Sequence, residues 1–110
     1  MNVREFVEKL GLKILTDENG MERNVAGIYS CDLMSWVMSH ASKGDAWITV
    51  HTHLNVVAVA LLTEVACVII PEGITVDEAT VNKANEEGII LLGTDMNAYE
   101  ICWKGHELLR

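Results

Sequence analysis

The fold is decided by residues 46–70, which read AWITVHTHLNVVAVALLTEVACVII. Two short apolar runs, 46–50 and 66–70, have the length of strands, and the longer run between them, 54–63, has the length of a helix. Glu64 is the only formally charged residue in the segment. A strand, a helix and a second strand in this order predict a crossover between two parallel strands, in a sheet that is covered on both faces.

The same alternation continues on both sides of this crossover. Before it, we expect a helix at 3–10, a strand at 12–15, a loop at 16–24, a strand at 25–29 and a helix at 31–41. After it, we expect a helix at 77–87, a strand at 89–92 and a helix at 96–109. Thr75 and Glu78 have the spacing of a capping box for the helix at 77–87, and Gly88 is placed to end it. The sequence thus predicts an α/β fold with a mainly parallel sheet of about five strands.

Composition limits the class of protein and the kinds of partner. With 110 residues, of which 50% are hydrophobic, the chain has the size of a single domain, residues 1–110. A formal net charge of −8 argues against nucleic acid and against a basic membrane-surface helix, since both kinds of binding need clustered Lys and Arg. No apolar run reaches the ~20 residues of a membrane span, and residues 1–10 lack the apolar run of a signal peptide, so we expect a cytoplasmic protein. The three cysteines have no CxxC spacing and suggest neither a disulfide framework nor a zinc site.

The helix expected at 54–63 is too apolar for a helix that exposes one side to water. Residues 56–62 are all Val, Ala or Leu, and the preceding helix spreads Leu33, Trp36 and Met38 beyond one stripe. Exposed apolar surface of this kind usually marks association. We therefore expect a homodimer that forms through the 54–62 helix and its neighbours. The alternative is a helix buried entirely within one monomer.

Polar residues follow the strands at the points where the strands end. In an open parallel sheet, ligands bind beyond the carboxyl ends of the strands, which meet at one edge. We therefore expect a ligand-binding site formed by Ser30, Asp32, His51, Thr52, His53, Asn55, Glu72, Thr94 and Asp95. Helices that begin near these residues have free N–H groups for an anion, which favours a small polar or phosphorylated ligand. The sequence has no GxGxxG motif and no P-loop motif, and it identifies no cofactor.

His51 and His53 allow three interpretations. Residues two apart on an extended segment point to the same side, so the two imidazoles fit a metal site that Asp32, Glu72 or Asp95 completes. A metal-dependent hydrolase that uses this pair is therefore one alternative function. In the second interpretation, one His and the Thr52 hydroxyl cap the next helix or bind a polar ligand. In the third, these residues are structural and hydrogen-bond to neighbouring loops. Cys31 suggests a catalytic thiol, but cysteine is more often a small buried apolar residue, so no residue is assigned as catalytic.

Three segments resemble the DRTGG domain family: AWITVHTHLN at 46–55, ACVIIPEG at 66–73 and residues 84–95. The resemblance covers nearly the whole chain and is strongest to a short, stand-alone branch of the family, on residues 32–33, 52–55 and 94–100. It implies a three-layer α/β/α sandwich, similar to the N-terminal domain of the HPr kinase/phosphorylase. It also implies a noncatalytic unit that senses a ligand or dimerises. Kinase activity is not implied, because these residues contain no P-loop.

The chain departs from the family at the motif that names it. Thr52-His53-Leu54 stands where the family has Gly-Asp-Arg, and Pro71-Glu72-Gly73 stands where it has Thr-Gly-Gly. Only Gly73 matches, so a ligand role of the family's Asp and Arg does not transfer to this chain. The sequence as a whole predicts a homodimeric regulatory domain without catalytic activity. A protein–protein adaptor that binds no small ligand is the remaining alternative.

Overall fold

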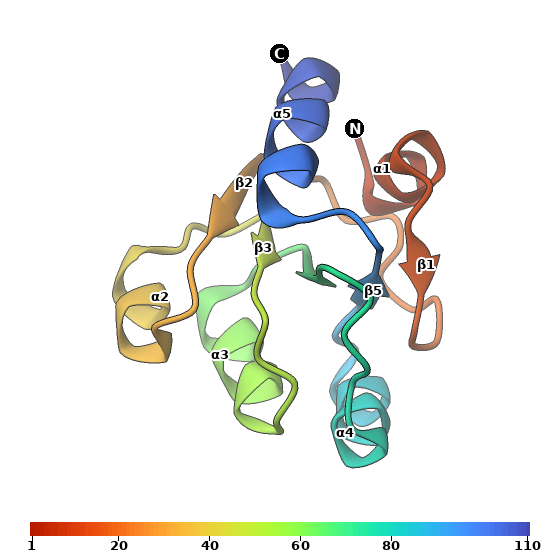
Figure 1. Cartoon of the computed structure of the whole chain (residues 1–110). Coiled ribbons are helices and arrows are strands. Elements are labelled where there is room, and N and C mark those ends of the chain that lie inside the picture. Colours follow the sequence, from red (N-terminus) through yellow and green to blue (C-terminus); the bar gives the residue numbers. More distant parts are fainter.

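The computed structural model describes residues 1–110, which form five helices and five strands (Figure 1). In chain order the elements are α1 (Val3–Leu10), β1 (Lys13–Ile14), β2 (Gly27–Ser30), α2 (Met34–His40), β3 (Asp45–Ile48), α3 (Asn55–Thr63), β4 (Cys67–Ile70), α4 (Glu78–Glu87), β5 (Leu91–Gly93) and α5 (Ala98–Leu109). Every helix and strand predicted from the sequence is present, and the ends differ from the predicted ones by at most three residues.

The five strands form one sheet in the order β1-β5-β4-β3-β2. Strands β2 to β5 are parallel, and β1 pairs antiparallel with β5, with Lys13 opposite Gly93. Each step from β2 to β5 moves to the next position in the same direction. Right-handed crossovers therefore place α2, α3 and α4 on one face of the sheet, and α1 and α5 cover the other face (Figure 1). The mainly parallel sheet and the three-layer α/β/α arrangement are confirmed.

The sheet divides the core into two halves, and β4 contributes to both. Successive side chains on a strand point to opposite faces. Cys67 and Ile69 accordingly pack in the half beneath α1 and α5, while Val68 and Ile70 pack in the half beneath α2, α3 and α4. Trp47 on β3 is fully buried in the second half, and its indole N–H donates to the carbonyl of Cys31 at 2.9 Å. This bond holds the segment after β2 against β3, close to the carboxyl edge of the sheet.

The capping box predicted at Thr75 and Glu78 is wrong. Helix α4 has Asp77 as its N-cap, with no side-chain hydrogen bond to the first turn. The two capping boxes of the structure lie elsewhere, at Asn2 with Glu5 and at Asn97 with its partner three residues later. Both begin with Asn, which is as good an acceptor as Thr at this position. Gly88 ends α4 in a left-handed conformation, as predicted.

Helix α3 is apolar for two reasons. Five of its nine residues are buried within the monomer, among them Val56, Val57 and Ala60. The rest of its apolar surface faces outward, and Leu62 is 69% exposed. Together with α2 it forms a surface that we call the α2–α3 patch, with the exposed side chains Leu33, Trp36, Met38, Leu54, Leu61 and Leu62. No helix in the structure is long and apolar enough to cross a bilayer.

Candidate functional site

The parallel strands bring the predicted polar residues to one edge of the sheet, as expected from the strand ends. There they fall into two separate groups. One group lies after β2 and β3 and includes Asp32 and His51. The other lies after β4 and β5 and includes Thr94 and Asp95, which line a pocket. The two groups differ in how many of their polar side-chain atoms are hydrogen-bonded within the chain.

Asp32 is part of a closed hydrogen-bond network. Its carboxylate Oδ1 accepts from the hydroxyl of Thr49 at 2.9 Å and from the backbone N–H of Val50 at 2.9 Å. The ring Nε2 of His51 lies within hydrogen-bond distance of the Asp32 carbonyl, and the backbone N–H of His51 donates to the Thr49 hydroxyl. Thr49, which the sequence analysis did not select, is 1% exposed and connects these groups. The network joins the ends of β2 and β3 with the chain's own side chains.

His51 and His53 do not converge. The Nδ1 atom of His53 lies 3.6 Å from the carboxylate of Asp77, and its side chain is 81% exposed. The His51 ring is engaged with Asp32 instead. No group of three or more His, Cys, Asp or Glu side chains in the structure has the arrangement of a metal site. The geometry that the metal interpretation requires, with both imidazoles on one side, is therefore not found, because β3 ends at Ile48 and the chain bends at Val50 and at His53 before α3.

The other predicted residues of this region have structural or exposed positions. The carbonyl of Thr52 accepts from the hydroxyl of Thr80, a buried residue of α4, at 2.6 Å. This bond ties the loop before α3 to α4. Ser30 and Asn55 are exposed and their side chains make no hydrogen bond within the chain. The side chain of Glu72 is also exposed, and it does not line the pocket.

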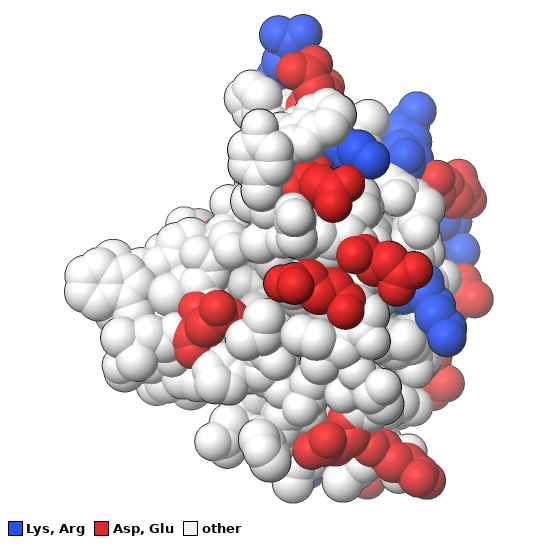
Figure 2. Space-filling model, in the orientation of Figure 1, with Lys and Arg blue, Asp and Glu red and all other residues white.

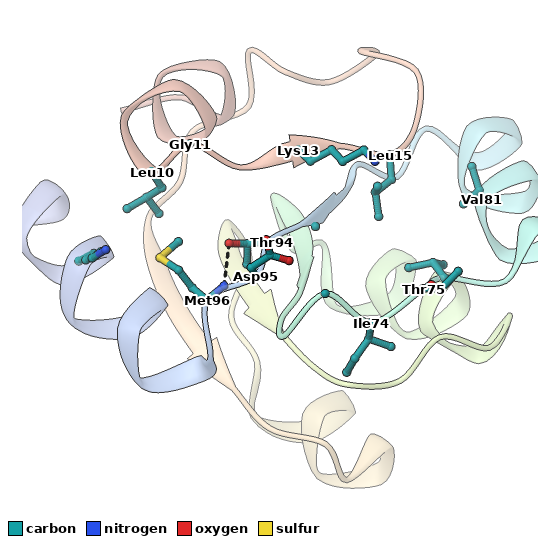
Figure 3. Close-up of a pocket in the computed structure, with 14 residues that line it drawn as sticks. Leu10, Gly11, Lys13, Leu15, Ile74, Thr75, Val81, Thr94, Asp95 and Met96 are labelled. Carbon is teal, nitrogen blue, oxygen red and sulfur yellow. Dashed lines mark hydrogen bonds between the residues drawn. The ribbon is translucent and has the colours of Figure 1, made fainter.

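The second group surrounds a pocket of about 710 Å³, which we call the β5 pocket. It opens at the carboxyl end of β5, bordered by the edge strand β1, the loop between β4 and α4, the loop between β5 and α5, and α5 itself (Figure 3). The chain leaves β4 toward α4 on one face of the sheet and leaves β5 toward α5 on the other. Such a change of face is where open α/β sheets bind ligands. Polar and charged lining residues are Lys13, Thr75, Thr94, Asp95 and Lys104.

Backbone hydrogen bonds hold the two loops of the β5 pocket together. The N–H of Gly73 donates to the carbonyl of Thr94 at 2.9 Å, and the N–H of Glu72 donates to the carbonyl of Met96 at 2.9 Å. Gly73 has a φ of 67°, and a Cβ at this position would lie 3.0 Å from Oδ1 of Asp95. Glycine is therefore favoured here both by the left-handed backbone and by the nearby carboxylate. The Thr94 hydroxyl accepts from the N–H of Met96 at 3.2 Å, as drawn in Figure 3.

The β5 pocket contains lysines that have no acidic partner. Five of the eight Lys and Arg side chains are held by an ion pair or by a hydrogen bond to a carbonyl. The other three, Lys9, Lys13 and Lys104, have neither, and of these Lys13 and Lys104 line the β5 pocket. The Nζ of Lys104 lies 5.6 Å from the centre of the Trp103 ring. Thr75 and Asp95 also make no side-chain hydrogen bond. In a protein of net charge −8, this pocket combines positive charge with free polar groups.

Lys13 and Lys104 were missed because nothing in their local sequence marks them. Lys13 reaches the pocket only because β1 pairs with β5, which lies about eighty residues later in the chain. Lys104 lies on α5, which covers the other face of the sheet from α4 (Figure 1). The folded structure separates the charges over its surface. Figure 2 shows no Lys or Arg over α2, acidic groups in the middle of the view, and basic groups toward the right and the top.

Two of the three cysteines have thiols whose pKa is raised by burial. All three thiols are free, and burial raises the pKa of the Cys67 thiol to about 12. Partial burial also raises the pKa of Cys102 above its usual value. A thiol nucleophile needs a lowered pKa, because the thiolate is the reactive form. The raised pKa values of Cys67 and Cys102 disfavour the thiolate. The Sγ of Cys31 lies 4.0 Å from the carbonyl oxygen of Leu33.

The fold and the pocket define an α/β domain with a partly cationic pocket at the carboxyl edge of its sheet. The structure is similar to the solved CBS and DRTGG domains of the regulatory region of Clostridium perfringens pyrophosphatase, complexed with the activator diadenosine tetraphosphate. The TM-score is 0.69 at 12% sequence identity, and the match covers 91% of this chain and 44% of that chain. No protein-family model and no curated protein matches the sequence. The likeness supports a DRTGG-like fold.

Proposed function

We propose that the chain is a noncatalytic regulatory domain that binds a small anionic ligand, such as a phosphorylated metabolite, in the β5 pocket. The observation that carries this proposal is the pair of lysines in the pocket, Lys13 and Lys104, which have no acidic partner in an acidic protein. Free ammonium groups attract phosphate, and the hydroxyls of Thr75 and Thr94 add hydrogen-bond donors. The proposal narrows the predicted site to Thr94 and Asp95 and adds the two lysines.

The similarity of fold supports a regulatory role. The similar structure is part of a regulatory region and was solved in complex with a nucleotide activator. The match covers only 44% of that chain. A regulatory role of the present chain is therefore our proposal. We also retain, as a proposal, that the chain belongs to the DRTGG family.

Homodimerisation through the α2–α3 patch is the second part of the proposal. The patch contains six exposed apolar side chains, and between residues 46 and 63 there is no charged residue. Such a surface resembles an interface more than a solvated face. A protein–protein adaptor would use the same patch for a different partner. A metal-dependent hydrolase has no comparable support, because His51 and His53 lie against different partners.

The ligand proposal is tested by calorimetric titration of pyrophosphate into the protein. We expect binding that weakens at least about tenfold in the double variant Lys13→Gln/Lys104→Gln, since each lost charged hydrogen bond contributes roughly 1.5–3 kcal/mol. The matched control is Lys9→Gln/Lys43→Gln, which removes the same charge outside the pocket. Absence of binding by pyrophosphate and by other phosphorylated compounds, or equal loss in both double variants, would contradict the proposal.

The dimer is tested by sedimentation equilibrium at tens of micromolar protein. We expect a dimer for the unmodified chain and a monomer for Leu62→Glu, because the glutamate would place a charge within the apolar contact. Tyr99→Glu is the control, since Tyr99 is 76% exposed on α5, outside the patch. A monomeric unmodified protein would refute dimerisation, and the adaptor would then be the better explanation of the patch.

A further inference from the structure

The β5 pocket is larger and chemically more varied than a site for an inorganic anion needs to be. Its volume of about 710 Å³ lies in the range of pockets that hold drug-sized ligands. Six of its 14 lining residues are hydrophobic, including Leu15, Ile74 and Val81. An inorganic anion next to the lysines would leave this apolar wall in contact with water. A ligand that fits the pocket therefore has an apolar part in addition to its negative charge.

The carboxylate of Asp95 adds a negative charge to the pocket and a second requirement for the ligand. This carboxylate accepts no hydrogen bond and forms no ion pair within the chain, and it lies beside Gly73. Figure 3 shows Thr94 and Asp95 between Leu10 on one side of the pocket and Val81 on the other. A carboxylate in this position repels a phosphate but accepts hydrogen bonds from hydroxyl groups. A fitting ligand therefore carries hydrogen-bond donors between its two ends.

We propose that the ligand of the β5 pocket is a ribonucleotide. Either lysine of the pocket, Lys13 or Lys104, attracts its phosphate, its sugar hydroxyls donate to Asp95, and its base covers the apolar wall. An acidic residue that accepts from ribose hydroxyls has the same role in dinucleotide-binding folds. This inference rests on the proposed function, because it assigns the chemical class of the ligand for the same pocket.

The inference is tested with the full chain by titration of AMP, GMP, CMP and UMP, with pyrophosphate as the anion that lacks sugar and base. We expect at least one ribonucleotide to bind, and its 2′,3′-dideoxy analogue to bind more weakly. Asp95→Asn should weaken the ribonucleotide about tenfold, because a hydrogen bond to a charged acceptor is replaced by one to a neutral acceptor. The same variant should strengthen pyrophosphate binding, because it removes a negative charge from the pocket.

These opposite directions separate a sugar-binding carboxylate from a charge that merely repels anions. If Asp95→Asn strengthens ribonucleotides and pyrophosphate alike, or if the dideoxy analogue binds as tightly as the ribonucleotide, the inference is wrong while the anion site stands. Binding of free amino acids without binding of nucleotides also overturns it, since a zwitterion can pair with Asp95 and a lysine. If no anion binds, or if Lys13→Gln/Lys104→Gln has no effect, the proposed function fails as well.

Discussion

Replacement of Asp32 by alanine should destabilise the fold without changing ligand binding. The Asp32 carboxylate accepts from the Thr49 hydroxyl and from the Val50 N–H, and both bonds are 2.9 Å long. They join the segment after β2 to the end of β3. Alanine removes both acceptors at once. The two donors differ in burial, because Thr49 is 1% exposed and Val50 is 42% exposed.

The size of the effect follows from this difference in burial. The hydroxyl of the buried Thr49 loses its acceptor, which costs about 1–3 kcal/mol. The Val50 N–H is at the surface and can donate to water, so its loss adds only about 0.5 kcal/mol. We expect the free energy of unfolding to fall by about 2 kcal/mol in total. For a domain of this size that corresponds to a decrease in Tm of roughly 10 °C.

Urea denaturation followed by circular dichroism measures this change. Asp32→Asn keeps an acceptor oxygen and should cost about half as much. Asp95→Ala is the matched control, because Asp95 has no hydrogen bond within the chain and its removal should change stability by less than about 0.5 kcal/mol. Equal stability of Asp32→Ala and Asp95→Ala would refute the division of the sheet edge into a structural network and a binding pocket. So would a loss of anion binding in Asp32→Ala at unchanged stability.

Three further predictions concern other parts of the chain. Thr80→Val leaves the Thr52 carbonyl without its donor and should lower the free energy of unfolding by about 1–2 kcal/mol in urea titrations, whereas Thr80→Ser should retain the bond. The Cys67 thiol should resist alkylation in the native protein and react only after unfolding, since it is 1% exposed. Burial raises the pKa of the Cys67 thiol from 9 to about 12, so on raising the pH the unfolded state loses this proton before the folded state does. The contribution of this thiol to the free energy of unfolding is therefore fully present below pH 9. It decreases between pH 9 and 12, by about 1.4 kcal/mol per pH unit. Comparison of alkaline unfolding with Cys67→Ala, which should lack this component, checks the sign.

Most of the fold could be predicted from the sequence because its crossovers are local. The segment from 46 to 70 contains two buried strands and the helix between them, and each has the length and apolar content of its element. The edge strand β1 was located, but its antiparallel pairing with β5 could not be foreseen. Two residues have no periodicity of their own, and the partner lies about eighty residues away. The position of Lys13 depends on that pairing, so its place in the β5 pocket could not be predicted.

Two of the nine predicted site residues, Thr94 and Asp95, line the β5 pocket. The rule that ligands bind after parallel strands selects residues by position, and it located Thr94 and Asp95 in the β5 pocket. It cannot tell which polar atoms are already satisfied. Asp32 is satisfied by Thr49, a residue whose burial depends on packing between layers. His53 points toward α4 because α3 begins immediately after it.

The most direct test of the binding site is an NMR titration of the ¹⁵N-labelled protein with pyrophosphate and with AMP. If the β5 pocket binds the ligand, the largest amide shifts will occur at Gly73, Gly93 and Thr94, and Lys13→Gln/Lys104→Gln will need a higher ligand concentration to produce them. Shifts centred on Asp32 and His51, or spectra that no anion changes, would contradict this assignment.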